Sequence, residues 1–361
     1  MVNSLIPHIA THPGEVLKDE LDTRDIKQKD FAADIGMQPS MLNEIIKAKR
    51  PITTDISLLF EKTLNIPADF WLNYQTQFDI DQARIKEKNI KKLQLIEQWQ
   101  LFKQYVPVKF FFKFGYLTYD IPEDIQTIKK IYQTDTLEEL VNSFASYKSG
   151  FLYRKSGKLK VDEVNMFGWS RLVMWLADKE KVSTYDPTKI EELKVKLHSV
   201  FVKNKNVRVQ SSKIMSEYGI KLVFQEKFEK TPVDGFSFWS GNNPAIGLTL
   251  RHKRIDNYAF TLFHELGHIC KHLQKDKLTQ FLDLEEERQK NYKEDEADLF
   301  ASNNLIPPQQ FKKLGNLNQV TDEKIISFSV KYKINPAIVL GRVCWEMDNY
   351  AVKSSIDRSL N

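Results

Sequence analysis

Residues 259–270 read Ala-Phe-Thr-Leu-Phe-His-Glu-Leu-Gly-His-Ile-Cys, an apolar run with two histidines spaced four residues apart. On an α-helix, residues i and i+4 lie one above the other, so His264 and His268 would present both imidazoles on one face. Glu265 follows the first histidine, and its carboxylate would reach a water activated by a metal without ligating that metal. The run therefore predicts a helix with the layout of a zinc hydrolase site.

The surroundings of the motif decide between a metal site and two surface histidines on an amphipathic helix. Apolar residues flank the motif on the relevant side: Phe260, Leu262, Phe263 and Ile269. Gly267 has no side chain and would let another backbone pack close to the metal. This context favours the metal site, which then needs a third protein ligand.

A third histidine is not available at a suitable spacing. The position six residues after His268 is Gln274. His272 lies two helical turns from His264, roughly 12 Å along the axis, which is too far for the two to share an ion. We interpret His272 as a partly exposed helix histidine.

An acidic residue on a following helix is the other source of a third ligand. Residues 291–308 predict such a helix, with an apolar stripe of Ala297, Phe300, Ala301 and Asn304. Projected at 100° per residue, Glu296 is expected near the centre of the stripe, and Glu294, Asp295 and Asp298 further from it. A carboxylate directed into a core must pair or bind metal, so Glu296 is the predicted ligand. The alternative is a glutamate at the edge of the stripe, paired with a lysine.

Composition places the chain among ordinary globular proteins, with 42% hydrophobic and 28% charged residues in 361. Its only cysteines, Cys270 and Cys344, exclude a disulfide framework and a CxxC metal site. We see no signal peptide at the N-terminus and no stretch of 18 apolar residues. We therefore expect a cytoplasmic protein without a membrane partner.

The order of the elements predicts a mainly α (α+β) fold in three parts. Residues 1–78 form a five-helix domain, residues 79–215 a helical connector and middle region, and residues 216–361 a metallopeptidase domain. Strands are expected at 220–224, 235–239 and 245–250, just before the histidine helix. Residues 245–250 are the candidate edge strand for holding an extended substrate, and Asp256 is the predicted N-cap of the histidine helix. Two closing helices are expected between Asp322 and Met347.

The first domain contains a helix-turn-helix signature. A helix from Gln28 ends at Gly36, which suits a left-handed C-cap, and a second helix starts near Met41 after a short turn. The predicted core residues are Phe31, Ile35, Leu42, Ile45, Leu58 and Leu59. The alternative is a helical bundle used only for protein contacts.

DNA contacts would come from a local patch, because acidic residues outnumber basic ones in residues 1–76. Polar residues at the start of the second helix would face base edges: Gln38, Ser40, Asn43 and Glu44. Lys47, Lys49 and Arg50 would lie beside phosphates, and Gln28 could bond another phosphate.

Four stretches resemble the HigA group of Xre-type antitoxins over about residues 8–80. They are His12-Pro-Gly-Glu-Val-Leu-Lys-Asp-Glu-Leu, Gln28-Lys-Asp-Phe-Ala, Leu42-Asn-Glu-Ile-Ile-Lys-Ala-Lys-Arg-Pro-Ile-Thr, and Pro67-Ala-Asp-Phe-Trp-Leu-Asn-Tyr-Gln. The resemblance implies a homodimeric repressor of its own toxin–antitoxin operon, with operator DNA and a toxin as partners.

The C-terminal part resembles zinc metallopeptidases of the ImmA/IrrE type. The matching stretches are Phe260-Thr-Leu-Phe-His-Glu-Leu-Gly-His-Ile, Glu294-Asp-Glu-Ala-Asp-Leu-Phe-Ala and Leu305-Ile-Pro. The resemblance implies that His264, His268 and Glu296 hold Zn²⁺ in a gluzincin-like arrangement, with Glu265 as the base. It also implies a repressor-like protein as the substrate.

Together these observations predict a DNA-binding regulator that carries a zinc endopeptidase. One alternative is a HigA-like repressor and antitoxin whose zinc site is structural or sensory. In another, the N-terminal domain docks a partner and binds no DNA. The intact Glu265 favours the enzyme, because a structural site has no use for a base. Tyr292 is the candidate for stabilising the oxyanion.

Overall fold

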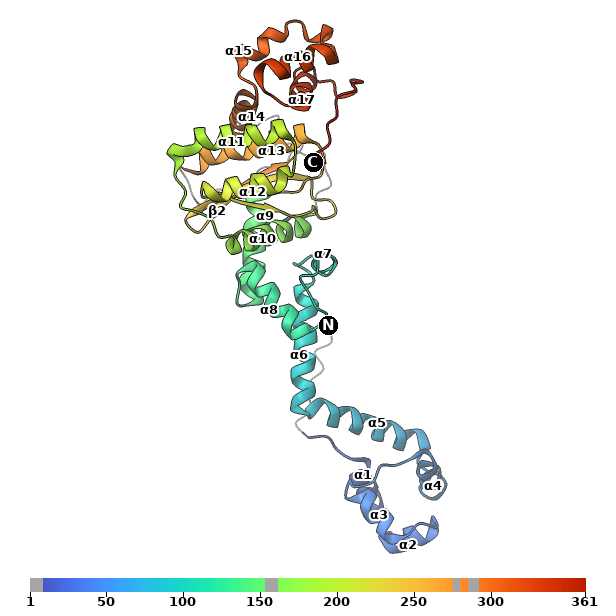
Figure 1. The fold of residues 1–361 in the computed structure, drawn as a ribbon. Helices are drawn as coiled ribbons and strands as arrows, with labels where there is room; N and C mark the ends of the chain where they lie inside the picture. Colours follow the sequence, from blue (N-terminus) through green and yellow to red (C-terminus); the bar gives the residue numbers. More distant parts are fainter. Residues whose placement is uncertain (1–8, 153–161, 275–279, 285–291) are drawn as a thin grey trace. The chain divides into compact units, whose positions relative to one another are not determined.

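The computed structural model describes residues 9–152, 162–274, 280–284 and 292–361. Its chain divides into two compact units, Met1–Trp99 and Gln100–Asn361. The predicted mainly α fold with a small sheet is confirmed (Figure 1). Among the described residues, no helix is long and apolar enough to cross a membrane. The N-terminal residues 1–8, where no signal peptide is expected, lie outside this description.

The first unit is built from short helices. They are α1 (Pro13–Thr23), α2 (Gln28–Asp34), α3 (Pro39–Ile46), α4 (Thr54–Leu64), α5 (Ala68–Ile85) and most of α6 (Glu87–Phe102). Gly36 has φ +64° between α2 and α3, which confirms the predicted left-handed C-cap. Four of the predicted core residues, Phe31, Ile35, Leu42 and Ile45, are buried.

The prediction of Leu58 and Leu59 as core residues is wrong. Their exposed fractions are 53% and 40%, whereas Phe60 and Leu64 of the same helix are buried. Phe60 packs between the rings of Phe31 and Trp71, with ring centroids 5.6 and 5.3 Å away. The buried face of α4 is therefore set by its aromatic residue, because a ring buries more apolar area than a leucine.

The His-Pro-Gly sequence at the start of α1 has a structural cause at each position. His12 caps the helix, since its Nδ1 accepts a hydrogen bond of 2.9 Å from the amide of Gly14. Pro13 occupies the first turn, where its missing N–H is not needed. A Cβ on Gly14 would lie 1.9 Å from the carbonyl oxygen of Ile45, so only glycine lets α1 meet the end of α3.

The second unit begins with helices that precede the sheet. They are α7 (Val108–Lys113), α8 (Ile121–Tyr132), α9 (Leu137–Leu152), α10 (Glu163–Lys179), the 3₁₀ turn η1 (Pro187–Lys189), α11 (Ile190–Lys203) and α12 (Val207–Glu217). Several pack directly on the elements that follow, and residues from Ile190 to Cys344 share one core. The predicted boundary at residue 215 therefore does not separate compact units.

A four-stranded sheet lies in the order β1-β3-β2-β4. The strands are β1 (Lys221–Phe224), β2 (Val233–Ser240), β3 (Asn243–Leu248) and β4 (Phe281–Leu284). The first three confirm the predicted strands, and β4 was not predicted. β3 pairs with β1 on one side and β2 on the other. The prediction of residues 245–250 as an edge strand is therefore wrong, and in the described chain the outer strands are β1 and β4.

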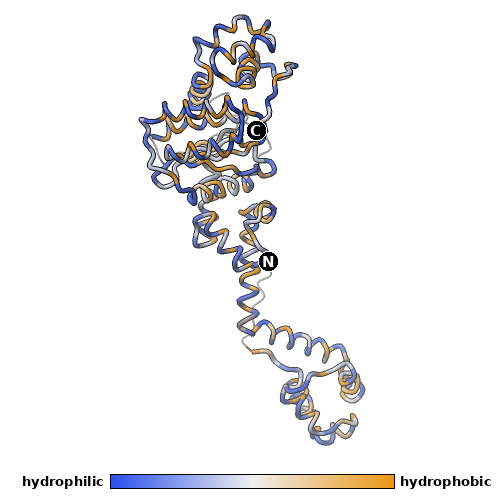
Figure 2. The backbone as a smooth tube through the Cα atoms, viewed as in Figure 1, coloured by the Kyte–Doolittle hydropathy of each residue, from blue (hydrophilic) through white to orange (hydrophobic). Residues whose placement is uncertain are grey.

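Helices cover both faces of the sheet (Figure 1). On one face, a Cβ on Gly247 would lie 2.4 Å from Val173 of α10, so this helix packs tightly on β3. On the other face lies α13 (Ile255–His268), which carries the two histidines. Residues along the helices alternate between hydrophilic and hydrophobic (Figure 2), as expected for helices that bury one side.

The remaining elements follow α13. They are a π-helical turn η2 (Ile269–Leu273), α14 (Tyr292–Leu305), α15 (Pro308–Phe311), the 3₁₀ turns η4 (Lys312–Leu314) and η5 (Leu317–Gln319), α16 (Asp322–Tyr332) and α17 (Pro336–Glu346). The last two confirm the predicted closing helices. Asp256 is not the N-cap of α13, which is Arg254. The Asp256 carboxylate instead pairs with Arg254 at 2.5 Å and with Arg358 of the C-terminal tail.

Candidate metal centre

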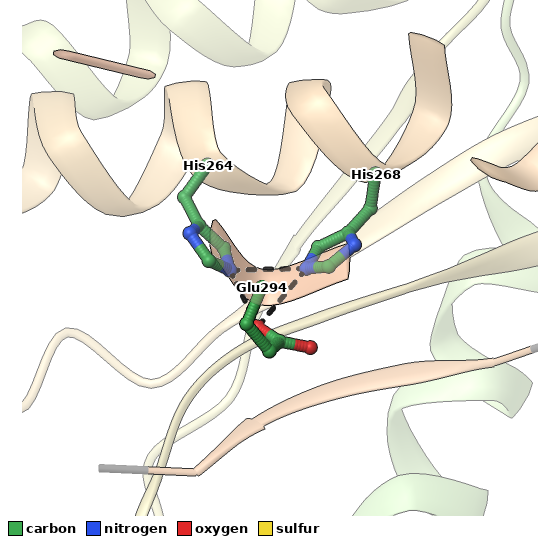
Figure 3. A group of neighbouring side chains, drawn as sticks. All are labelled: His264, His268 and Glu294. Carbon is green, nitrogen blue, oxygen red and sulfur yellow. Dashed lines mark hydrogen bonds and ion pairs between the residues drawn. The ribbon is translucent and has the colours of Figure 1, made fainter. Parts of the chain in front are cut away.

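His264 and His268 extend from one face of α13 toward Glu294 of α14, as predicted for the histidine pair (Figure 3). Their Nε2 atoms lie 3.0 Å apart. The Glu294 Oε2 atom lies 3.1 Å from the Nε2 of His264 and 3.3 Å from that of His268. Two nitrogens and one carboxylate oxygen therefore converge on one point.

The spacing of these three atoms fits a zinc ion. Ligand atoms about 2.0–2.1 Å from a tetrahedral zinc ion lie roughly 3.3–3.4 Å from one another. The observed separations of 3.0 to 3.3 Å are close to that value. Imidazole nitrogen and carboxylate oxygen are also ligands that zinc prefers. Three protein ligands leave one tetrahedral position open, as in catalytic rather than structural zinc sites.

Burial and mutual contacts tune the charges of the group. Both histidines are fully buried and Glu294 is 6% exposed. Burial by itself would raise the pKa of Glu294, but its hydrogen bonds with His264 and His268 lower that pKa far below the ordinary value. Burial lowers the pKa of His268. An ionised Glu294 carboxylate and a neutral His268 imidazole are protonation states that metal binding requires.

The structure brings Glu294, not Glu296, to the histidines. Glu294 precedes Ala297 by three residues and Ala301 by seven, so it lies on the buried stripe of α14. Glu296 is one residue before Ala297 and therefore about 100° around the helix. Its side chain is 54% exposed. The phase predicted for Glu296 is wrong.

Each histidine is also held from its other ring nitrogen. The Nδ1 of His264 lies 2.8 Å from Asp298 Oδ1. The Nδ1 of His268 lies 3.1 Å from Nδ1 of His272, whose Nε2 lies 2.8 Å from Glu296. Such outer partners fix the tautomer and the orientation of a metal-binding histidine.

His272 is buried, with 8% exposure, so its prediction as a partly exposed histidine is wrong. If Nε2 of His268 faces a metal, its Nδ1–H donates to His272, and the Nε2–H of His272 then donates to Glu296. The residue predicted as a ligand thus belongs to a hydrogen-bonded chain that ends at one of the ligands.

Glu265 is fully buried on the side of α13 that faces β2. A Cβ on Gly235 would lie 2.0 Å from the Glu265 Oε1 atom, so the carboxylate lies directly against the backbone of β2. Next to it along the same helix, the ring of His268 stacks on Phe281 of β4, with centroids 4.4 Å apart. The sheet therefore positions both the acid and one histidine.

Several residues around the centre were missed from the sequence. Asp298, Gly235 and Phe281 come from separate elements, and only Asp298 carried a signal, since it lies four residues after Glu294 on the same helix face. Tyr292, the candidate for oxyanion stabilisation, is 68% exposed at the start of α14. No contact of Tyr292 with the three converging residues is found in the described chain.

The residues predicted to contact DNA lie at the start of α2, at the start and on the body of α3, and in the segment that follows α3. Exposed among them are Gln38, Ser40, Asn43, Lys47 and Lys49, whereas Gln28, Glu44 and Arg50 are half-buried. Gln38 is the N-cap of α3, so this helix begins at Pro39, two residues before the predicted start near Met41. Arg50 Nε pairs with Glu44 at 2.8 Å, so the two lysines carry the accessible positive charge of this patch.

Family models match two parts of the chain. Residues 17–71 match the helix-turn-helix model, and residues 215–343 match the IrrE N-terminal-like domain of the Peptidase_M78 family. The second match contains α13, α14 and the three converging residues.

Known proteins are similar to part of the chain. Virulence-associated protein I of Dichelobacter nodosus is 34% identical over 82 residues, which cover 22% of this chain and 76% of that protein. The uncharacterized HTH-type transcriptional regulator YbaQ of Escherichia coli strain K12 is 27% identical over 88 residues, or 24% of this chain and 78% of the regulator.

A solved structure of an addiction module antidote protein of a HigA family, from Coxiella burnetii, is 31% identical with a TM-score of 0.23. The alignment covers 24% of this chain and 92% of that one. The chain thus carries an Xre-type helix-turn-helix domain, related to virulence-associated protein I, at its N-terminus, and an IrrE-like domain of the Peptidase_M78 family in its C-terminal part.

Proposed function

We propose that this protein is a DNA-binding transcriptional regulator of the antitoxin-repressor type whose C-terminal domain is a zinc-dependent endopeptidase. The substrate would be a regulatory protein partner. The observation that carries the proposal is the convergence of His264, His268 and Glu294 within a peptidase-family domain, with Glu265 adjacent on the same helix.

In this proposal the three converging residues hold Zn²⁺. When bound there, the ion would act as a Lewis acid toward a peptide carbonyl and would acidify a water. Glu265 would take the proton from the attacking water and return it to the leaving amine. Asp298 and His272 would keep the two imidazoles in the orientation that binding needs.

The position of Glu265 suits the role of a base. Its carboxylate is held between α13 and β2, and the residue that directly precedes it on the helix is the proposed ligand His264. A buried carboxylate has little freedom to turn, so a proton can be transferred without reorienting the acid. The burial of the site also strengthens its electrostatic interactions.

Glu265→Gln separates proteolysis from metal binding. The amide keeps the shape of the side chain but cannot accept a proton at neutral pH. We expect the purified variant to retain zinc, measured by elemental analysis, and to lose cleavage. Cleavage is measured by adding wild-type or variant protein to an extract of the source cells and identifying new protein N-termini by mass spectrometry.

New N-termini that appear with the wild type and not with Glu265→Gln would identify the substrate. If the two proteins produced the same N-termini, the proteolytic proposal would be refuted. A zinc-loaded protein without cleavage would favour the alternative of a non-proteolytic repressor in which zinc is structural or sensory.

For the regulatory half we propose that α3 enters the major groove of operator DNA. The exposed Lys47 and Lys49 would contact phosphates. Their joint replacement by alanine should reduce the slope of log K against log salt by about 2, at about 0.9 per lost phosphate contact. Fluorescence anisotropy with the DNA upstream of the gene measures this slope.

Replacing Lys62 by alanine serves as the matched control, because it lies on α4, away from α3 and the segment that directly follows it. An unchanged slope for the double variant would favour a domain that docks a protein partner.

A further inference from the structure

A cavity of about 500 Å³ lies in the second unit, beside the candidate metal centre. The first turns of α13, the end of α14, α17 and the C-terminal tail border it. Phe260 links the two sites, because it lines the cavity and its ring centroid is 6.3 Å from that of His264. The cavity is therefore one helical turn away from a candidate ligand.

The charge of the cavity wall is mainly positive. Its lining includes the arginines Arg251, Arg254, Arg342 and Arg358, against the two carboxylates Asp234 and Asp256. Asp256 pairs with both Arg254 and Arg358. Asp234 Oδ1 lies 3.4 Å from Arg251 Nε. Such a wall favours an anionic occupant.

Two of these arginines each have a side-chain nitrogen that donates no hydrogen bond within the described part of the chain. Arg342 Nη1 and Arg358 Nε are buried, and no acceptor for either lies within hydrogen-bonding distance in the described part of the chain. A buried donor without a partner is costly. Both residues line the cavity, so a carboxylate or phosphate group bound there would lie beside both guanidinium groups.

Neighbouring groups hold the two arginines in place, and the Arg358 guanidinium pairs with Asp256. The carbonyl of Arg358 accepts a hydrogen bond of 2.9 Å from the amide of Ile255, which fixes the tail against the start of α13. The Arg342 guanidinium lies 4.6 Å from the ring centroid of Trp345. The donors are thus preorganised, which favours binding of an anion.

Aromatic side chains form the rest of the wall. Trp345 is 38% exposed and Tyr350 is 60% exposed, and both line the cavity with Phe260. Exposed rings next to guanidinium groups provide surfaces on which a flat apolar group can stack. The volume lies within the range of small-molecule sites, about 300–1,000 Å³, and exceeds what a single carboxylate group would fill.

We propose that this cavity binds a small organic anion that joins a flat apolar body to a carboxylate or phosphate group. Arg342 and Arg358 hold the anionic group, and Trp345 packs against the flat body. The bound molecule lies next to Phe260 and so next to the candidate metal centre. Binding does not require the protein to be a peptidase.

A pair of matched fluorescent probes tests the proposal on the full chain. The first probe is 8-anilinonaphthalene-1-sulfonate, which is flat, apolar and anionic. The second is N-phenyl-1-naphthylamine, which has the same flat body without the anionic group. We expect the wild type to bind the anionic probe at one site per chain and at least about tenfold more tightly than the neutral probe.

Arg342→Gln and the double variant with Arg358→Gln should lose this preference for the anionic probe. Arg342 pairs with Glu346 on its own helix, so the single variant leaves the ion pair of the tail, Arg358 with Asp256, in place. Arg208→Gln is the control, because Arg208 also lies over an aromatic ring, Phe224 at 4.7 Å, but does not line the cavity. Circular dichroism checks that each variant is folded.

The proposal is overturned if the folded variants keep the wild-type preference, or if the control loses as much of it. It is equally overturned if the wild type binds both probes alike. Since only binding is measured, these outcomes are independent of whether the chain cleaves a protein.

Discussion

Gly235→Ala should impair proteolysis without releasing the metal. The new Cβ would lie 2.0 Å from Oε1 of Glu265, 2.7 Å from its Cδ and 2.8 Å from its Cγ. Ordinary van der Waals contact begins near 3.4 Å, so the carboxylate oxygen would have to move by about 1.4 Å. The three nearest atoms all belong to Glu265, and none belongs to the candidate metal ligands His264, His268 and Glu294.

The size of the expected effect follows from this displacement. A misplacement of about 1 Å in a catalytic group costs on the order of 10²-fold in rate. We therefore expect kcat/KM to fall by at least about 10²-fold, which corresponds to about 2.7 kcal/mol of transition-state stabilisation. The added methyl group should also destabilise the fold by about 1–3 kcal/mol, as overpacking usually does.

Gly247→Ala is a control for the overpacking. Gly247 pairs with Phe236 in the same sheet, but its Cβ would meet Val173 of α10 at 2.4 Å on the opposite face. Both variants are assayed for bound zinc, thermal stability and cleavage of the substrate found with Glu265→Gln. Wild-type kcat/KM in a folded Gly235→Ala protein would refute the assignment of Glu265 as the base, and equal losses in both variants would show an effect of packing alone.

Further predictions concern the ligand, the first unit and pH. Glu294→Gln should weaken zinc binding by at least roughly 10²-fold, about a quarter of the binding free energy of a four-ligand site. Glu296→Gln should weaken it by only about tenfold, through His272. Competition with a chelator measures both, and a reversed order would contradict the geometry. Gly14→Ala should unfold the helix-turn-helix unit, because the methyl group would lie 1.9 Å from a carbonyl oxygen of α3; a wild-type melting curve of that unit would refute this. Burial lowers the pKa of His198, against the opposing hydrogen bond with the carbonyl of Asn304, so its stabilising contribution is complete above about pH 6.5 and is lost as the pH falls through the lowered folded value. Urea midpoints at pH 7 and pH 5 should therefore differ less in His198→Gln than in the wild type.

The sequence alone was sufficient to predict features that depend on residues close to one another in the chain. The C-cap at Gly36 and the pairing of His264 with His268 depend on residues close in sequence. Such features follow from helix periodicity and capping alone. The first three strands also carried an apolar pattern of their own.

The errors arose where a choice between neighbouring residues depends on distant partners. Phe60 is buried in place of Leu58 and Leu59, because its ring packs between those of Trp71 and Phe31. Glu294 lies at the two histidines in place of Glu296, because the packing of α14 against α13 fixes the rotation of α14 about its own axis. Asn304 and Phe300 alone do not determine that rotation, since both are only half-buried.

The residues at the centre that were not predicted share one property. Each lies far in the sequence from the residue that it contacts. Phe281 of β4 reaches His268 only after the chain has returned to pair with β2. Gly235 precedes Glu265 by 30 residues, and its role is defined by the space that it leaves empty. A sequence pattern records the residues that are present at a site, and it does not record which backbone must come close.

The space that Gly235 leaves for the Glu265 carboxylate bears on whether the centre is catalytic or structural. A structural zinc site needs its ligands and the partners that orient them, here Asp298 and His272. It does not need a fully buried carboxylate beside them, and burying such a group costs free energy. Any larger residue at position 235 would occupy the place of that carboxylate. Two elements of the fold thus hold an acid in the place that a proton-transfer role requires, which supports the proposed endopeptidase over the structural alternative.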